Sequence, residues 1–361
     1  MAAKTYFSRD YADARQRFLD AAGAAGAALD ARAHPLNGPA GEALFTDLAW
    51  LGPPEAERVL VTISATHGVE GFCGSGAQVG WLESGLTREQ PAGTAHLMVH
   101  AINPHGFAWL RRVTEDNVDL NRNFVDHEAP YPENSGYEAL TEALSPRDWD
   151  EAVIAESQAA LEVFAEANGR TALQSAISGG QYRHPEGIFF GGRRPTWSRL
   201  LMEEIFEARL ARAQKVAVVD FHTGLGPHGH SERICVHAPG STALKRAAEW
   251  YRDDITSPAL GTSSSIELHG CNEVGMEKAL AGRELTAIAL EYGTIPTPEV
   301  RLALCADNWL HHHGELDSPK GKAIKEQIRA AFYPDTDDWK EQVWERAVET
   351  LRLALKGLAE G

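Results

Sequence analysis

Cysteine is scarce in this chain of 361 residues, which contains four: Cys73, Cys235, Cys271 and Cys305. They lie far apart and form no C-x-x-C pair, so the sequence indicates neither a disulfide framework nor a thiolate zinc site. The first 18 residues are charged throughout, and the stretch 21–29 is too weakly hydrophobic for a signal peptide. We therefore expect a reduced, cytoplasmic protein.

Positive charge is also in deficit. Lys+Arg 34 against Asp+Glu 51 leaves a formal net charge of -17, and long-range repulsion then argues against a nucleic-acid or anionic-membrane surface. No apolar run is long enough to span a bilayer. Any anionic substrate has to be held by locally placed arginines. We expect a small molecule or a short peptide as the partner and leave a homo-oligomer open.

Two common loop motifs are missing as well. The segment 74–76 (GSG) lacks the G-x-G-x-x-G spacing of a phosphate loop, and Cys73 stands where a nucleophile elbow needs glycine. What remains is an ordinary globular composition, 43% hydrophobic and 24% charged, without repeats or an obvious linker. This composition is typical of one large domain or of a domain with appended pieces, and we predict a single catalytic domain over residues 1–361.

An apolar strand that ends in H-x-x-E is the feature from which the chemistry follows. The run 59–63 (VLVTI) stops just before His67 and Glu70. Both side chains therefore lie on a turn at the end of a buried strand, where open α/β sheets place their sites. Gly68 and Gly71 allow the turn to be tight. An imidazole and a carboxylate are two of the three protein ligands that a catalytic zinc site uses.

A second apolar run, 215–219, leads into His222 in the same way. Two strands that end in histidine at one edge of a sheet can present both imidazoles to one metal. His228, His230 and the cluster 311–313 are rival ligands. Neither group follows a strand, so we interpret them as solvated or as partners of the ligands.

The run 286–290 (TAIAL) ends in Glu291. A carboxylate at the end of an apolar strand is costly unless it has a partner or a chemical role. Glu291 is therefore a candidate general base.

The segment 111–124 is rich in arginine and asparagine and follows a further predicted strand, 95–102. Arginine binds carboxylates bidentately, so the segment could be an anion clamp. Glu115, Asp116 and Asp119 lie among the arginines, however, and composition alone favours a solvated loop of internal ion pairs. The Gly- and Arg-rich stretch 178–195 is either a loop that lines a site or a plain connection.

The rest of the pattern is mostly helical. Helices are predicted over residues 8–29, 76–84, 145–169 and 195–212. An amphipathic tail helix from Trp339 would pack on the body or on another subunit. Residues 34–51 are predicted to form a loop and a short strand.

Five motifs in a fixed order resemble the zinc carboxypeptidase superfamily, closest to its succinylglutamate desuccinylase and aspartoacylase side and the bacterial relatives of that group. They are H-x-x-E at 67–70, N-P-x-G-F at 103–107, D-L-N-R-N at 119–123, the strand-end histidine 222 and L-E-Y-G at 290–293. The resemblance implies a three-layer α/β/α fold with a twisted, mixed, mostly parallel central sheet. Residues around 125–195 would then be an insertion and residues around 320–361 a carboxyl-terminal helical extension.

The resemblance also implies one zinc per chain and a role for each matching residue. Three side chains would bind the zinc: His67, Glu70 and His222. Asp119 would orient the first zinc histidine, Asn121 and Arg122 would hold a substrate carboxylate, and Glu291 would be the general base. Arg112 would polarise the scissile carbonyl, with the adjacent Arg111 as the alternative.

One departure concerns tyrosine. Carboxypeptidases of this superfamily carry a mobile tyrosine shortly before the catalytic glutamate, whereas residues 252–290 contain none. Tyr182 and Tyr292 are possible substitutes.

Together these features predict a zinc-dependent hydrolase that cleaves an amide bond next to a carboxylate, using metal-activated water. The substrate would be an N-acyl amino acid or a short peptide. Two alternatives stay open: a non-catalytic zinc-binding protein on the same fold, and a metal-free ligand-binding protein with an arginine clamp. The ligand set also suits cobalt, manganese or iron.

Overall fold

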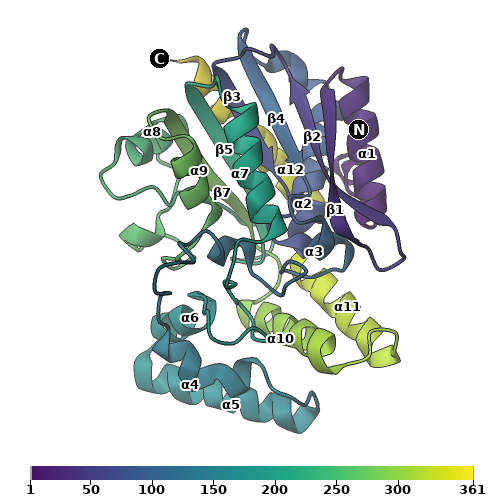
Figure 1. The fold of residues 1–361 in the computed structure, drawn as a ribbon, viewed down its shortest axis with the longest axis vertical. Coiled ribbons are helices and arrows are strands. Elements are labelled where there is room, and N and C mark those ends of the chain that lie inside the picture. The colour runs from purple at the N-terminus through teal and green to yellow at the C-terminus, as the bar shows by residue number, and fades with distance from the viewer. Residues whose placement is uncertain (1, 361) are drawn as a thin grey trace.

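The structure, a computed structural model, describes residues 2–360. Its centre is a seven-stranded sheet in the order β1-β2-β4-β3-β5-β7-β6 (Figure 1). Strands β2 and β6 run opposite to the other five. The strands are β1 Ala28–Asn37, β2 Ala43–Leu51, β3 Arg58–Ile63, β4 Thr94–His100, β5 Lys215–Thr223, β6 Ser231–Ile234 and β7 Glu284–Tyr292.

Helices cover both faces of the sheet because its central strands are apolar on both sides. In β3, Val59 and Val61 belong to one buried cluster and Leu60 to the other, as the two-residue period of a strand requires. The first face packs against α7 (Trp197–Arg209) and α9 (Asn272–Ala279). The other packs against α1 (Tyr11–Ala24), α2 (Gly71–Glu83), α8 (Thr242–Trp250) and α12 (Asp337–Ala359).

A third group of helices lies beyond the carboxyl ends of β3, β5 and β7, at the bottom of Figure 1. It shares a separate apolar cluster that includes Leu140, Leu161 and Ile328. Its members are α4 (Ser135–Leu144), α5 (Glu151–Asn168), α6 (Arg170–Ser178), α10 (Thr297–His313) and α11 (Pro319–Phe332), and the short α3 (Pro104–Ala108) lies between them and the sheet. A cavity can therefore form between these helices and the strand ends.

The predicted α/β/α fold with a mixed, mostly parallel sheet is confirmed, and the strands predicted around 59–63, 95–102, 215–219 and 286–290 correspond to β3, β4, β5 and β7. The tail helix packs on the body of the chain, where Trp339, Val343 and Leu351 are fully buried. Residues 125–195 contain α4, α5 and α6, but their origin as an insertion stays a prediction. No helix within residues 2–360 is long and apolar enough to cross a membrane.

Two predictions about local structure were wrong. Residues 28–51 form a long antiparallel hairpin, β1 and β2, where a helix end, a loop and a short strand were expected. Strand β1 is an edge strand whose side chains are mostly exposed, so its apolar pattern is weak. The helix predicted from residue 145 begins at Glu151 instead, because Asp150 rather than Ser145 accepts the capping bond from the Val153 N–H.

Candidate metal centre and substrate cavity

The turn after β3 is held in place by a neighbouring loop. The N–H groups of Gly68 and Val69 donate to the carbonyls of Arg112 (3.1 Å) and Arg111 (2.9 Å). A Cβ atom on Gly68 would lie 2.0 Å from the carbonyl carbon of Gly106. The glycine is therefore required by close backbone approach rather than by an unusual φ angle.

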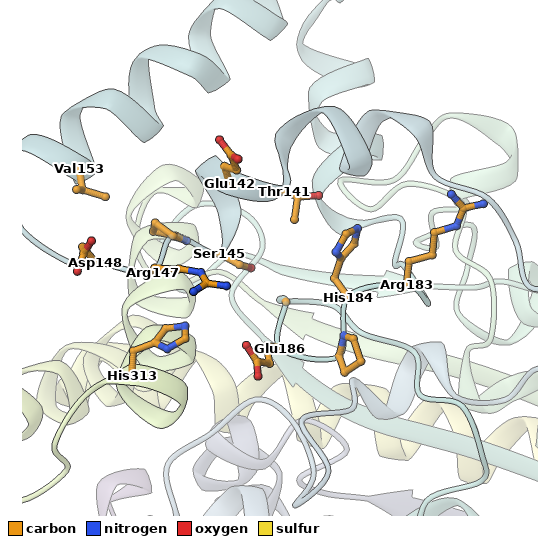
Figure 2. A pocket seen from close by; sticks show the side chains of 13 residues that line it. Thr141, Glu142, Ser145, Arg147, Asp148, Val153, Arg183, His184, Glu186 and His313 are labelled. Carbon is orange, nitrogen blue, oxygen red and sulfur yellow. The ribbon is translucent and has the colours of Figure 1, made fainter.

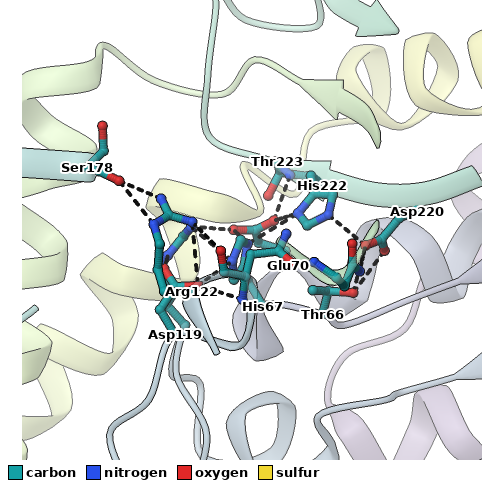
Figure 3. Close-up of polar contacts among 12 residues, drawn as sticks. Thr66, His67, Glu70, Asp119, Arg122, Ser178, Asp220, His222 and Thr223 are labelled. Carbon is teal, nitrogen blue, oxygen red and sulfur yellow. Dashed lines mark hydrogen bonds and ion pairs between the residues drawn. The ribbon is translucent and has the colours of Figure 1, made fainter. Parts of the chain in front are cut away.

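The structure brings His67, Glu70 and His222 together at the carboxyl ends of β3 and β5 (Figure 3). The two Nδ1 atoms are 3.2 Å apart. Glu70 Oε1 lies 3.1 Å from His67 Nδ1, and Glu70 Oε2 lies 3.2 Å from His222 Nδ1. This is the one group of potential metal ligands among the described residues whose donor atoms converge in this way.

Both imidazoles are oriented from behind by carboxylates. His67 Nε2 lies 3.1 Å from Asp119 Oδ1, and His222 Nε2 lies 2.9 Å from Asp220 Oδ2. A proton held on His222 Nε2 leaves its Nδ1 lone pair directed at the shared centre, which is the arrangement that a histidine ligand needs. His67 Nε2 has a second neighbour, Arg112 Nη2, at 2.9 Å. The donor set of two imidazoles and one carboxylate fits a zinc ion.

Asp220 was missed in the sequence, although an acid two residues before His222 in an apolar strand was the available signal. It also accepts hydrogen bonds from Thr66 Oγ1 (2.9 Å) and from Asn272 Nδ2 (2.7 Å). The position of Asn272 depends on how α9 packs and could not be read locally.

Positive groups surround the buried Glu70. Arg112 Nη1 donates to Glu70 Oε1 (3.0 Å), and the Thr223 N–H donates to Glu70 Oε2 (2.9 Å). Although burial opposes ionisation, the pKa of Glu70 is lowered by His67, His222 and Arg112. Glu70 is therefore a carboxylate that is ready to bind a cation.

Glu291 lies beside His222 because the parallel register of β5 and β7 pairs these two residues. Its Oε1 accepts a hydrogen bond from the Leu225 N–H (3.0 Å), and its side chain lines the cavity described below. Burial, reinforced by the negative charge of Glu70, raises the pKa of the Glu291 carboxyl. A buried carboxylate beside the ligand group, but outside it, has the properties of a proton acceptor.

The interpretation of residues 111–124 as a solvated loop was wrong, because the segment is mostly buried. Arg112 donates to Asp119 Oδ2 (3.0 Å) as well as to Glu70. Arg111 points elsewhere, to Asp307 (3.2 Å) and Asn117 (2.9 Å). Of the two arginines, Arg112 is the one at the metal-ligand group.

Asn121 and Arg122 also line the cavity. The Arg122 guanidinium donates to the carbonyls of Ser178 (2.6 Å) and Asn121 (2.8 Å), which fixes its plane without neutralising its charge. Figure 3 shows the bond between Arg122 and Ser178. The glycine-rich stretch from residue 178 therefore lines the site and is not a plain connection.

The cavity has a volume of about 460 Å³ and opens in front of His67, His222 and Glu291. Its walls are largely apolar, with polar groups both at the metal ligands and on the helical side, where Glu273 and Arg301 lie. Volume and lining are typical of small-ligand sites. The apolar lining residues include Leu173, Ile177, Phe189, Leu225, Ile234, Val236, Leu268, Val300 and Leu304.

The rival histidines and the substitute tyrosines lie outside this cavity. His228 bonds Asp338 (3.0 Å) on the surface, and the cluster 311–313 ends α10. The hydroxyl of Tyr182 donates to the Arg122 carbonyl (2.6 Å), and that of Tyr292 donates to the Val343 carbonyl (3.1 Å). Neither tyrosine takes the place of the mobile one.

A second hollow, of about 650 Å³, lies between the α4–α5 connection, residues 183–187 and the end of α10 (Figure 2). Its lining is mixed and includes the titratable residues Glu142, Asp148, His184 and His313. Among residues 2–360, no three potential metal ligands converge there. The candidate site for a metal-dependent reaction is therefore the first cavity, in front of His67 and His222.

Several solved structures are similar to this chain. Carboxypeptidase A from Helicoverpa armigera is 12% identical, with a TM-score of 0.53 over 97% of this chain and 73% of that one. Thrombin activatable fibrinolysis inhibitor is 9% identical (TM-score 0.48; 98% and 75% covered). A succinylglutamate desuccinylase/aspartoacylase from Rhodobacter sphaeroides is 13% identical (TM-score 0.38; 81% and 66% covered).

The likeness to carboxypeptidase A confirms, at the level of the fold, the resemblance seen in the sequence. Among curated proteins, none matches the chain. One family model matches residues 7–346, nearly the whole sequence. The chain accordingly belongs to the family described as "Protein of unknown function (DUF2817)".

Proposed function

We propose that the chain is a zinc-dependent hydrolase that cleaves an amide bond next to a carboxylate, in an N-acyl amino acid or a short peptide. The observation that carries this proposal is Glu291, a buried carboxylate that shares the cavity with His67 and His222 without belonging to the ligand group. A purely structural zinc site closes its fourth position with another ligand and needs no such base.

A zinc ion, when bound, supplies the Lewis acidity that brings the pKa of a coordinated water close to neutrality. Glu291 then takes the proton of the attacking water. Its Oε1 is held by the Leu225 N–H, whereas no described residue donates to Oε2, which is left to accept the proton. Burial is the main cause of the raised pKa of Glu291, and a positive charge bound at Glu70 would offset the second cause, repulsion by Glu70, and so lower the pKa of the base.

Arg112 and Arg122 would have different roles, one at the reacting carbonyl and the other at the substrate carboxylate. Arg112 stands beside the ligand group and would stabilise the charge that develops on the carbonyl oxygen. Arg122 is held only by backbone carbonyls, and its nearest carboxylate, Asp119, is 4.0 Å away, so its charge is available to an anion. Asn121 would assist with its amide N–H groups, since its Oδ1 already accepts from the Asn272 N–H.

The test is elemental analysis of the purified chain beside a His67→Ala/His222→Ala variant, followed by a screen of N-acyl amino acids and dipeptides for amide hydrolysis. We expect one zinc per chain, its loss in the double variant, and hydrolysis by the zinc-loaded parent only. Zinc bound without hydrolysis of either substrate class would favour a non-catalytic zinc protein. A parent chain that takes up no added zinc would contradict the proposal altogether.

A further inference from the structure

Glu273 is a second buried carboxylate of the cavity, and the mechanism above does not use it. It lies in the first turn of α9, lines the cavity, and is 6% exposed. Its Oε2 has no hydrogen-bond partner among the described residues. A native structure that leaves a buried polar atom unpaired at the wall of a cavity calls for an explanation.

The surroundings of Glu273 compensate its charge only in part, because its own backbone N–H in the first turn of α9 and the nearby His222 favour the carboxylate but do not outweigh its burial. Burial, with added repulsion from Asp220, raises its pKa. Of the two basic side chains in its environment, His222 belongs to the metal-ligand group, and His237 is occupied by Glu277 (2.9 Å) and by the Ala287 N–H (3.0 Å). A buried carboxylate without a basic partner is stabilised most by a cation that enters the cavity as part of the ligand.

The substrate-carboxylate anchor lies close to Glu273. Asn272, the residue immediately before it, donates from its backbone N–H to Asn121 Oδ1 (3.2 Å). Asn121 and Arg122 are the groups proposed to hold the substrate carboxylate. A substrate residue anchored there can extend its own side chain toward the start of α9.

The adjoining wall of the cavity is aliphatic. Ile234 and Ala289 are paired neighbours on β6 and β7, and Val236 and Leu268 line the same cavity. These side chains favour a hydrocarbon stem and offer no partner to a second polar group along it. An aliphatic chain with a positively charged end would match both the wall and Glu273.

We propose that Glu273 determines substrate specificity by binding the protonated amine or guanidinium at the end of an aliphatic substrate side chain. The substrate class would then be N-acyl derivatives or short peptides of a basic amino acid, with the basic residue on the carboxylate side of the cleaved bond. This inference rests on the proposed function for the placement of the substrate carboxylate.

The test measures binding, so that it does not depend on turnover. The affinities of Nα-acetyl-L-lysine and Nα-acetyl-L-norleucine are determined by calorimetry on the zinc-loaded Glu291→Gln chain. The two probes share the carboxylate, the amide and the aliphatic stem, and they differ in the terminal amine. A charge-assisted hydrogen bond in a buried site should make the lysine probe bind at least about 10-fold more tightly.

Three further variants in the same background isolate the charge of Glu273. Glu273→Gln should bring the two affinities within about 2-fold of each other by weakening only the lysine probe. Glu273→Asp keeps the charge and should keep the preference. Glu284→Gln removes a charge at the exposed start of β7, outside the cavity, and should change neither affinity.

Equal affinities of the two probes for the Glu291→Gln chain, or no binding of either, would overturn the proposal. So would a lysine preference that persists in Glu273→Gln. Failure of the proposed function is a different result: a wild-type chain that binds the lysine probe selectively but cleaves no amide retains the role of Glu273. A chain that cleaves basic and neutral substrates equally well remains a hydrolase and excludes this role.

Discussion

The two walls of the cavity differ in how their charges are satisfied. At the strand ends, Glu70, Asp119 and Asp220 all accept hydrogen bonds from the chain itself. On the helical side, Glu273 has an unpaired oxygen, and the half-buried Arg301 of α10 forms no hydrogen bond or ion pair with any residue from 2 to 360. The side chains of the strand-end wall are therefore hydrogen-bonded and oriented before a ligand binds. The charged groups of the helical wall obtain partners only when a ligand binds.

The largest effect on turnover is expected from Glu291→Gln, a substitution at the boundary between the two walls. Gln keeps the bond from the Leu225 N–H but cannot take a proton, so turnover should fall by about 10²- to 10⁴-fold while zinc content stays unchanged. Parallel kinetics and elemental analysis test this. Glu284→Gln, at the exposed start of the same strand, is the control. Near-normal turnover in the Glu291 variant would show that Glu291 is not the general base.

The adjacent arginines offer the next contrast. Arg112→Lys loses the fork that reaches Glu70 and Asp119, and kcat should fall by about 10²- to 10³-fold. Arg111→Lys breaks buried bonds to Asp307 and Asn117 instead, so it should lower the unfolding temperature and leave kcat of the folded enzyme nearly intact. Thermal unfolding and kinetics on both variants separate these roles. A large loss of kcat in Arg111→Lys with little loss in Arg112→Lys would show that Arg111, not Arg112, stabilises the reacting carbonyl.

The strand-end wall could be predicted from the sequence because its information is local. The apolar runs before His67, His222 and Glu291 specify buried strands, and parallel strands bring their carboxyl ends to one edge. The resemblance to a known family then supplied Asp119, Asn121 and Arg122, against the reading that composition favoured. In the structure this segment is mostly buried, with bonds from Arg122 to the Ser178 carbonyl and from Arg111 to Asp307, whereas the roles of these residues stay a prediction.

The helical wall could not be predicted in the same way. Glu273 reaches the cavity only through the packing of α9 against α7 and the sheet, and its sequence context shows no strand end. The β1 strand was missed for a related reason, since an edge strand carries little apolar pattern. Residues whose role depends on distant packing leave a weak local signal.

A smaller effect is expected for the carboxylates behind the imidazoles. Asp220→Asn and Asp119→Asn keep the side-chain volume but weaken the bond to His222 or His67, so zinc affinity should fall by about 10- to 100-fold. Competition with a chelator measures the affinity. Turnover at saturating zinc should recover more fully for Asp220→Asn, because Asp119 also holds Arg112. Unchanged zinc affinity in both variants would show that the strand-end wall is not prepared by these bonds.

The smallest effect is expected on the free energy of unfolding in the absence of substrate. Glu273→Gln removes an unpaired buried charge, so it should raise the free energy of unfolding by on the order of 1 kcal/mol near neutral pH, whereas Asp220→Asn on the other wall should lower it. The folded pKa of Glu273 is raised above its usual value of 4.5. Its favourable contribution is therefore complete below that value and is lost as the pH rises through the folded pKa. The advantage of Glu273→Gln over the parent should accordingly grow from acid toward neutral pH, as measured by urea unfolding of zinc-loaded protein. A variant that is less stable than its parent across this range would mean that Glu273 has a partner within the chain, and the two walls would then be alike.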